Sequence, residues 1–180
     1  TFNLMENQHK TLTTKNGTYL GLILIACTVI VYSVNLELIL KPWFVIVLFF
    51  FVIGFGIYST MGYKKQLNGF ISFKQGFSSF ILPIIIGMLL SSVVSFLLFN
   101  FIDTEAATFL KEKTIEMTVN MMEGFGAPEA SINEAVTKLE NQNQFGIAGI
   151  LKSLAFQIVF YAVVGLIVAL SFKKKDPNLE

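Results

Sequence analysis

The acidic side chains of residues 103–146 form the densest group of ionisable residues in this sequence of 180 residues. Four of them recur near one line of a helix that turns about 100° per residue, namely Glu105, Glu112, Glu116 and Glu123. Carboxylates in a row suggest cation binding, but a line along one helix does not converge on a point. Calcium requires about six to eight oxygen ligands around it. We therefore expect a solvated acidic face and no metal site.

Other residue types that support catalysis or metal binding are scarce. His9 and Cys27 are the single His and Cys, so we expect neither an intramolecular disulfide nor a zinc site. All thirteen basic residues are Lys, and the absence of Arg disfavours bidentate recognition of phosphate or carboxylate. The net charge of +1 provides no field that attracts a nucleic acid. We expect no catalytic residue, no cofactor and no nucleic-acid partner.

The composition instead indicates an integral membrane protein. Hydrophobic residues make up 54% and charged residues 14% of the chain, whereas a typical soluble domain has about a quarter of its residues charged. Four uncharged stretches of 21, 22, 28 and 20 residues separate the charged positions. Each can cross the hydrocarbon core, which needs about 20 helical residues. The sequence predicts an all-α four-helix bundle with spans near 17–36, 43–63, 77–102 and 147–172.

The lysines near the predicted helix ends are divided unevenly between the two sides. Eight lie on the side of the termini and five on the other side. By the positive-inside rule, this asymmetry predicts a membrane protein with both termini in the cytoplasm and residues 103–146 outside. Residues 1–4 and 179–180 resemble segments added by cloning, so we expect the native membrane domain to span 5–177.

The segment 103–146 predicts an external helical hairpin of two amphipathic helices, near 104–123 and 128–141. Gly and Pro at 124–128 end the first helix, whereas the start of the second is ambiguous because residues 131–134 also match a capping box. Opposite the acidic line lies an apolar stripe, which we name the methionine stripe: Leu110, Met117, Met121 and Phe125. We expect it to be covered by the second helix, the bundle or a second copy of the chain. It is our candidate contact for a partner.

Small and polar residues interrupt the third and fourth predicted spans. Gly87, Ser91 and Ser95 recur every four residues, which favours close helix packing within the bundle or, alternatively, a dimer interface. Pro83 is expected to kink the third span. Gln157 is the deepest amide, and it predicts an interhelical hydrogen bond or, alternatively, a substrate contact.

Residues 69–77 form a distinctive motif between the second and third spans. We expect Ser72 to cap a short amphipathic helix in the membrane interface, with the phenylalanines in the acyl boundary and Lys74 at anionic head groups. The residues of this candidate interfacial motif are Ser72, Phe73, Lys74, Gln75 and Phe77.

This motif, the third span ending at 100–103, the acidic Met-rich hairpin and the Lys-rich end at 173–177 together resemble the domain of unknown function 4199 family. The resemblance covers about 6–177 of the chain. It implies a bacterial membrane protein without an established activity, so no functional residues carry over. Relatives encoded beside a membrane glycosyltransferase imply an accessory role in envelope glycan or lipid-linked sugar metabolism.

We therefore expect a non-enzymatic accessory or scaffold protein that binds the lipid bilayer and another membrane protein or itself. The alternative is a small oligomeric transporter or channel. That alternative requires a continuous polar path across the membrane, lined by Ser91, Ser95, Asn100 and Gln157.

Overall fold

The computed structural model describes residues 2–174, with side chains described from residue 10 onward. The described residues are helical and contain no β-sheet, only one isolated bridge between Ile71 and Lys174, which confirms the all-α prediction. The expected non-native residues 1, 179 and 180 lie outside the described part, as does Lys175. The elements in chain order are α1 (Phe2–Val34), the 3-10 helix η1 (Leu36–Leu40), α2 (Pro42–Gln66), α3 (Phe73–Leu97), the π-helix η2 (Leu98–Ile102), α4 (Thr104–Gly124), α5 (Glu129–Glu140) and α6 (Ile147–Phe172).

Four helices are long and apolar enough to cross a membrane, as the sequence predicts. The last one matches the prediction at both ends. The first begins well before residue 17 and ends at Val34, because Asn35 is extended and its side chain accepts a hydrogen bond from the Glu37 backbone N–H. The four candidate spans are Lys10–Val34, Pro42–Gln66, Phe73–Ile102 and Ile147–Phe172.

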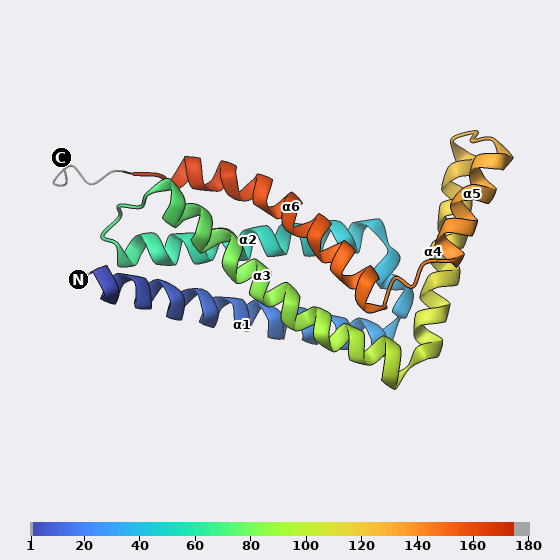
Figure 1. Ribbon diagram of the computed structural model, residues 1–180, viewed down its shortest axis with the longest axis horizontal. Helices are drawn as coiled ribbons and strands as arrows, with labels where there is room; N and C mark the ends of the chain where they lie inside the picture. The colour runs from blue at the N-terminus through green and yellow to red at the C-terminus, as the bar shows by residue number, and fades with distance from the viewer. Residues whose placement is uncertain (1, 175–180) are drawn as a thin grey trace.

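The helix α3 occupies the centre of the bundle and packs against α1, α2 and α6. Figure 1 shows these four helices running along the long axis of the molecule, with α3 crossing between its neighbours. The main apolar core lies around it and includes Leu20, Phe80, Ile84 and Tyr161. Pro83 is buried inside α3.

Glycines allow the helices to approach α3 closely. A Cβ atom added at Gly17 would lie 2.6 Å from the Cβ of Ile86, so α1 has no room for a larger residue there. Gly76 of α3 faces Ala169 of α6, where an added Cβ would lie 3.4 Å from the Ala169 Cα. Small residues at such crossings let backbones approach and increase van der Waals contact.

At one end of the bundle, the α2–α3 loop is joined to the end of α6; we call this the lysine-rich end. Ile71 and Lys174 exchange backbone hydrogen bonds of 3.0 and 2.9 Å. The Lys64 Nζ atom donates to the Phe172 carbonyl at 2.9 Å. The Ile71 side chain is 1% exposed, so this end is closed by buried contacts as well as by hydrogen bonds.

At the opposite end, α4 and α5 lie against each other and stand across the bundle axis (Figure 1). We call these two helices the α4–α5 arm. They are joined by residues 125–128, where Gly126 has a φ of 70°, a conformation that favours glycine. The second helix begins at Glu129 after Pro128, which resolves its ambiguous start.

Candidate partner-binding surface on the α4–α5 arm

The start of α4 is fixed by Asp103. Its side chain caps the helix by accepting a hydrogen bond of 2.9 Å from the Ala106 backbone N–H. The Tyr32 hydroxyl donates a second hydrogen bond of 2.7 Å to the same carboxylate. These bonds, with that from Tyr32 the stronger cause, hold the pKa of Asp103 below its ordinary value. The carboxylate therefore ties the arm to the end of α1.

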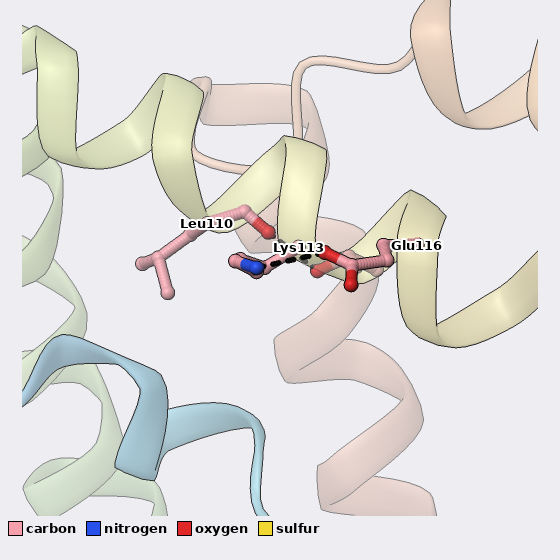
Figure 2. A network of polar contacts seen from close by, with 4 residues as sticks. Leu110, Lys113 and Glu116 are labelled. Atoms are coloured by element: carbon pink, nitrogen blue, oxygen red, sulfur yellow. Dashed lines mark hydrogen bonds and ion pairs between the residues drawn. The ribbon is translucent and has the colours of Figure 1, made fainter. Parts of the chain in front are cut away.

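Apolar packing reinforces this attachment. Leu110 is 1% exposed and belongs to a small core with Leu98, Phe99 and Ala106. In Figure 2 its side chain points away from Glu116, and it packs with residues of η1 and the neighbouring helix ends. The Phe99 and Phe145 rings lie 4.5 Å apart at their centroids. The base of the arm is thus part of the folded bundle.

Beyond this base, the methionine stripe is not covered. Met117 is 40% exposed, Met121 58% and Phe125 85%. Of the covers expected for the stripe, neither the second hairpin helix nor the bundle shields these three residues within the single chain, and only Leu110 is buried. The molecule presents an apolar surface at the end of the arm.

The physical reason is the rotation of α4. Lys111 donates a hydrogen bond to the Glu140 carbonyl, so its side of α4 faces α5. The half-buried Ile115 and Met122 lie on the same line of the helix. Met117 and Met121 lie about 120° around the helix from that line. At Leu110, the face of α4 that carries the methionine stripe meets the bundle. At Met117, about 10 Å further along the helix, the same face extends past the bundle.

The acidic residues occupy the third side of α4. All four of them are exposed, as expected for a solvated face: Glu105, Glu112, Glu116 and Glu123. Lys113 forms an ion pair of 2.8 Å with Glu116, shown by the dashed line in Figure 2. This contact raises the pKa of Lys113. Among the described residues, no three His, Cys, Asp or Glu side chains gather in a way that could hold a metal ion.

The candidate interfacial motif lies at the lysine-rich end, far from the arm. Ser72 accepts a hydrogen bond from the Gln75 backbone N–H, and the Gln75 side chain accepts one from the Ser72 N–H. This capping box begins α3 itself. The prediction of a separate interfacial helix is therefore wrong, because the motif continues directly into the spanning helix.

The phenylalanines of this motif also differ from the expectation. Phe77 is half-buried, and an added Cβ at Gly165 of α6 would lie 3.3 Å from its ring. Phe73 stacks on Phe77 with ring centroids 6.5 Å apart. Lys74 remains exposed. The motif packs α3 against α6 through Phe77, whereas Ser72 and Lys74 are exposed.

The small-residue strip of α3, formed by Gly87, Ser91 and Ser95, is buried over part of its length. Gly87 is buried at the crossing with α1, where an added Cβ would lie 2.8 Å from the Cγ of Leu20. Ser91 and Ser95 are half-buried. Gly87, at the crossing with α1, is therefore more completely buried than the two serines.

The polar residues of the alternative channel are dispersed. Asn100 donates hydrogen bonds of 2.9 and 2.8 Å to the Phe96 and Phe145 carbonyls near the arm. Gln157 is exposed on α6 and donates to the Ser153 carbonyl of its own helix. The prediction that Gln157 forms an interhelical hydrogen bond is therefore wrong within the single chain.

Sequence reasoning missed one buried polar pair. The Asn16 amide donates a hydrogen bond of 3.0 Å to the Ser59 hydroxyl, and both residues are almost fully buried. Asn16 belongs to the polar segment before the expected first span, so only the helical extension of α1 brings it into the bundle. No local pattern signals this contact.

Comparison with known proteins identifies a family. No curated protein and no solved structure matches the chain. The pattern of a family described as protein of unknown function (DUF4199) matches residues 15–174. This match covers all four candidate spans except the first residues of α1, and it includes the whole α4–α5 arm. The chain belongs to the DUF4199 family.

Proposed function

We propose that this protein is a non-enzymatic accessory protein of a bacterial inner membrane, and that the exposed methionine stripe of the α4–α5 arm binds another membrane protein. One observation carries the proposal. The base of the arm is fixed by Leu110 and Asp103, while Met117, Met121 and Phe125 remain exposed. An apolar surface on a fixed support suits partner binding, and methionine adapts to partners of varied shape.

The charge of the arm favours a basic partner over a second copy. Residues 103–146 contain eight acidic residues and three lysines, hence a net charge of −5. Two copies joined through their stripes would bring together two arms that each carry this net negative charge, which is unfavourable. A partner with an apolar patch flanked by Lys or Arg would complement both the stripe and the net negative charge of the arm.

We further propose that the arm lies outside the cytoplasm and that the partner acts in envelope glycan or lipid-linked sugar metabolism. The lysine asymmetry supports the orientation. Cysteines replacing Gly124 and Gln66, each in a Cys27→Ser background, test it with a membrane-impermeant thiol reagent on intact spheroplasts. We expect labelling at 124 and none at 66. The reverse pattern would contradict the orientation.

Site-specific photo-crosslinking in native membranes tests the partner. A photoreactive residue at position 121 is expected to give one discrete adduct, whereas a residue at position 112, on the acidic face, is expected to give far less. The adduct at 121 should disappear when Met117→Asp is added. The crosslinked protein, identified by mass spectrometry, should be an integral membrane protein with basic residues beside the contact.

Two results would contradict the proposal. The absence of an adduct at 121 would mean that the stripe binds no protein, and an adduct of two copies of this chain would show self-association instead. Hydrogen exchange of the arm provides the control for Met117→Asp. Because Met117 is 40% exposed, exchange across 104–140 should stay close to that of the parent.

The oligomeric channel receives less support from the geometry. Its polar residues lie on separate surfaces, with Asn100 beside Phe145 and Gln157 on the outer side of α6. A path between copies of the chain would need them on one shared face of each copy. We therefore favour the accessory role.

A further inference from the structure

An open apolar groove of about 530 Å³ runs between α1 and α2 on the side of the lysine-rich end. Its walls are Leu12, Tyr19, Leu22 and Ile23 from α1, and Phe55 and Tyr58 from α2. Lys15 lies at the groove, and Asn16 forms part of its lining. The groove is at the opposite end of the molecule from the α4–α5 arm, so it is independent of the proposed partner surface.

The packing of the helices explains the groove. Gly17 and Gly21 bring α1 tightly onto α3, where added Cβ atoms would contact Ile86 and Leu90 at 2.6 and 2.9 Å. On α2, an added Cβ at Gly56 would lie 2.7 Å from the Phe80 ring of α3. Both helices are therefore held by α3 and leave a trough between them. The Asn16–Ser59 hydrogen bond joins them across it.

The charge around the groove is of one sign. The Lys15 Nζ atom lies 5.8 Å from the centroid of the Tyr19 ring, which places the ammonium beside the groove wall. A neighbouring shallow hollow on α1 is lined by Lys10, Lys15, Tyr19 and three threonines. The sequence contains no Asp or Glu in 7–36 or 38–102. Between residues 10 and 102, the part of the spans whose side chains the structure describes, the single carboxylate is Glu37 at the other end of the molecule, so an anion here meets ammonium and hydroxyl groups.

The dimensions of the groove fit one leaflet of a bilayer. From Lys15 to Ile23, α1 rises about 12 Å, which is most of the roughly 15 Å that half of the hydrocarbon core measures. Tyr19 is 50% exposed and Tyr58 is 65% exposed, on opposite walls. Tyrosines favour the level of the head groups, next to the lysines. The polar and apolar parts of the groove thus follow the order of a lipid molecule.

We propose that this groove binds one anionic phospholipid, with its phosphate at Lys15 and the adjoining threonine hydroxyls and one acyl chain along the apolar walls. The bilayer supplies this ligand directly. The complementarity is twofold: the ammonium of Lys15 matches the phosphate, and the walls between Tyr19 and Ile23 match the chain. The site would bind a specific lipid in the leaflet at the lysine-rich end.

Native mass spectrometry of the full chain tests the proposal. The protein is released from nanodiscs that contain equal amounts of phosphatidylglycerol and phosphatidylcholine. We expect one phosphatidylglycerol to be retained preferentially. Lys15→Gln should weaken its retention about fivefold, which corresponds to about 1 kcal/mol for one lysine near an anionic lipid. Lys41→Gln, which removes an exposed lysine at the other end, should leave retention unchanged.

A second pair of variants separates the acyl chain from the phosphate. Ile23→Trp fills the groove without changing charge and should also reduce retention. Ile167→Trp places the same bulk on an exposed position of α6 and should not. Unchanged thermal stability of Lys15→Gln and Ile23→Trp establishes that the fold is intact.

Three outcomes would overturn the proposal. Equal retention of the two lipids would show that no anionic head group is selected. Retention unaffected by either Lys15→Gln or Ile23→Trp would place the bound lipid elsewhere. Displacement of the lipid by millimolar inorganic phosphate would show binding of the phosphate alone, without the acyl chain.

Discussion

The two ends of the bundle are built differently. At the lysine-rich end, the loop between α2 and α3 and the end of α6 are joined by a pair of backbone hydrogen bonds between Ile71 and Lys174. At the other end, the α4–α5 arm is attached over its base alone, through Leu110 and Asp103. The residues of the lysine-rich end are therefore packed together, whereas the α4–α5 arm extends beyond the contacts that attach it to the bundle.

This difference determines where apolar surface remains available outside the candidate spans. At the lysine-rich end, Ile71 in the loop between α2 and α3 is 1% exposed. On the arm, Met121 and Phe125 are 58% and 85% exposed. A surface helix normally buries its apolar face to remain stable in water. The comparison therefore directs the search for a protein partner to the arm.

The largest expected effect comes from the base of the arm. Leu110→Ala removes a fully buried side chain, and such truncations cost about 2–5 kcal/mol because they leave a cavity. We expect amide hydrogen exchange across 104–140 to accelerate sharply. Met121→Ala is the matched control, because the Met121 side chain is 58% exposed and its removal should leave exchange nearly unchanged. Equal effects of the two variants would mean that the arm is attached through the stripe as a whole.

The second effect concerns close packing at the lysine-rich end. Gly76→Leu places a large side chain where even a Cβ lies 3.4 Å from the Ala169 Cα. Overpacking of this kind costs about 1–3 kcal/mol in the free energy of unfolding. Gly124→Leu at the end of α4 meets nothing within 4 Å and should change the unfolding free energy little. Unfolding in detergent measures both, and a comparable loss at Gly124 would contradict the difference between the ends.

The sequence predicts the spans and the two arm helices well because their signals are local. The length of an uncharged stretch determines whether it can cross the membrane, and Gly and Pro near 124–128 mark the break in the arm. The end of the first span is less accurate, since Asn35 caps η1 and stops α1 at Val34. Such a cap is a small polar signal within an apolar pattern.

The surfaces could not be predicted in the same way because they depend on contacts between distant residues. The acidic line of α4 follows from periodicity alone. Which of its other two faces meets α5 depends on the contact of Lys111 with Glu140, 29 positions away. Likewise, Ser72 could cap either a short interfacial helix or α3, and the packing of Phe77 near Gly165 accompanies the second arrangement.

A smaller effect on stability is expected from replacing Lys64 at the lysine-rich end. Its ammonium donates to the Phe172 carbonyl at the end of α6 and lies 5.4 Å from the Phe172 ring centroid. A cation at a helix C-terminus is favourable. Replacing Lys64 by Met should reduce the unfolding free energy by about 1–2 kcal/mol. Lys65→Met removes the same charge from an exposed neighbour and should cost less. Equal losses would indicate a general charge effect instead of this hydrogen bond.

The smallest effect is expected from the titration of the Asp103 carboxyl group at the base of the α4–α5 arm. Because the bonds from Tyr32 and Ala106 lower the pKa of Asp103, the folded arm binds its proton more weakly than the unfolded chain. The resulting stabilisation is complete above the ordinary pKa of 3.8 and is lost as the pH falls through the lowered folded value. Tyr32→Phe removes the largest cause, so the pKa of Asp103 should rise toward 3.8. Carbon-detected NMR of the carboxyl group measures it, with Glu134 as an internal control whose pKa is lowered by Lys138 within α5. An unchanged Asp103 pKa in Tyr32→Phe would mean that Tyr32 does not hold the arm through this carboxylate.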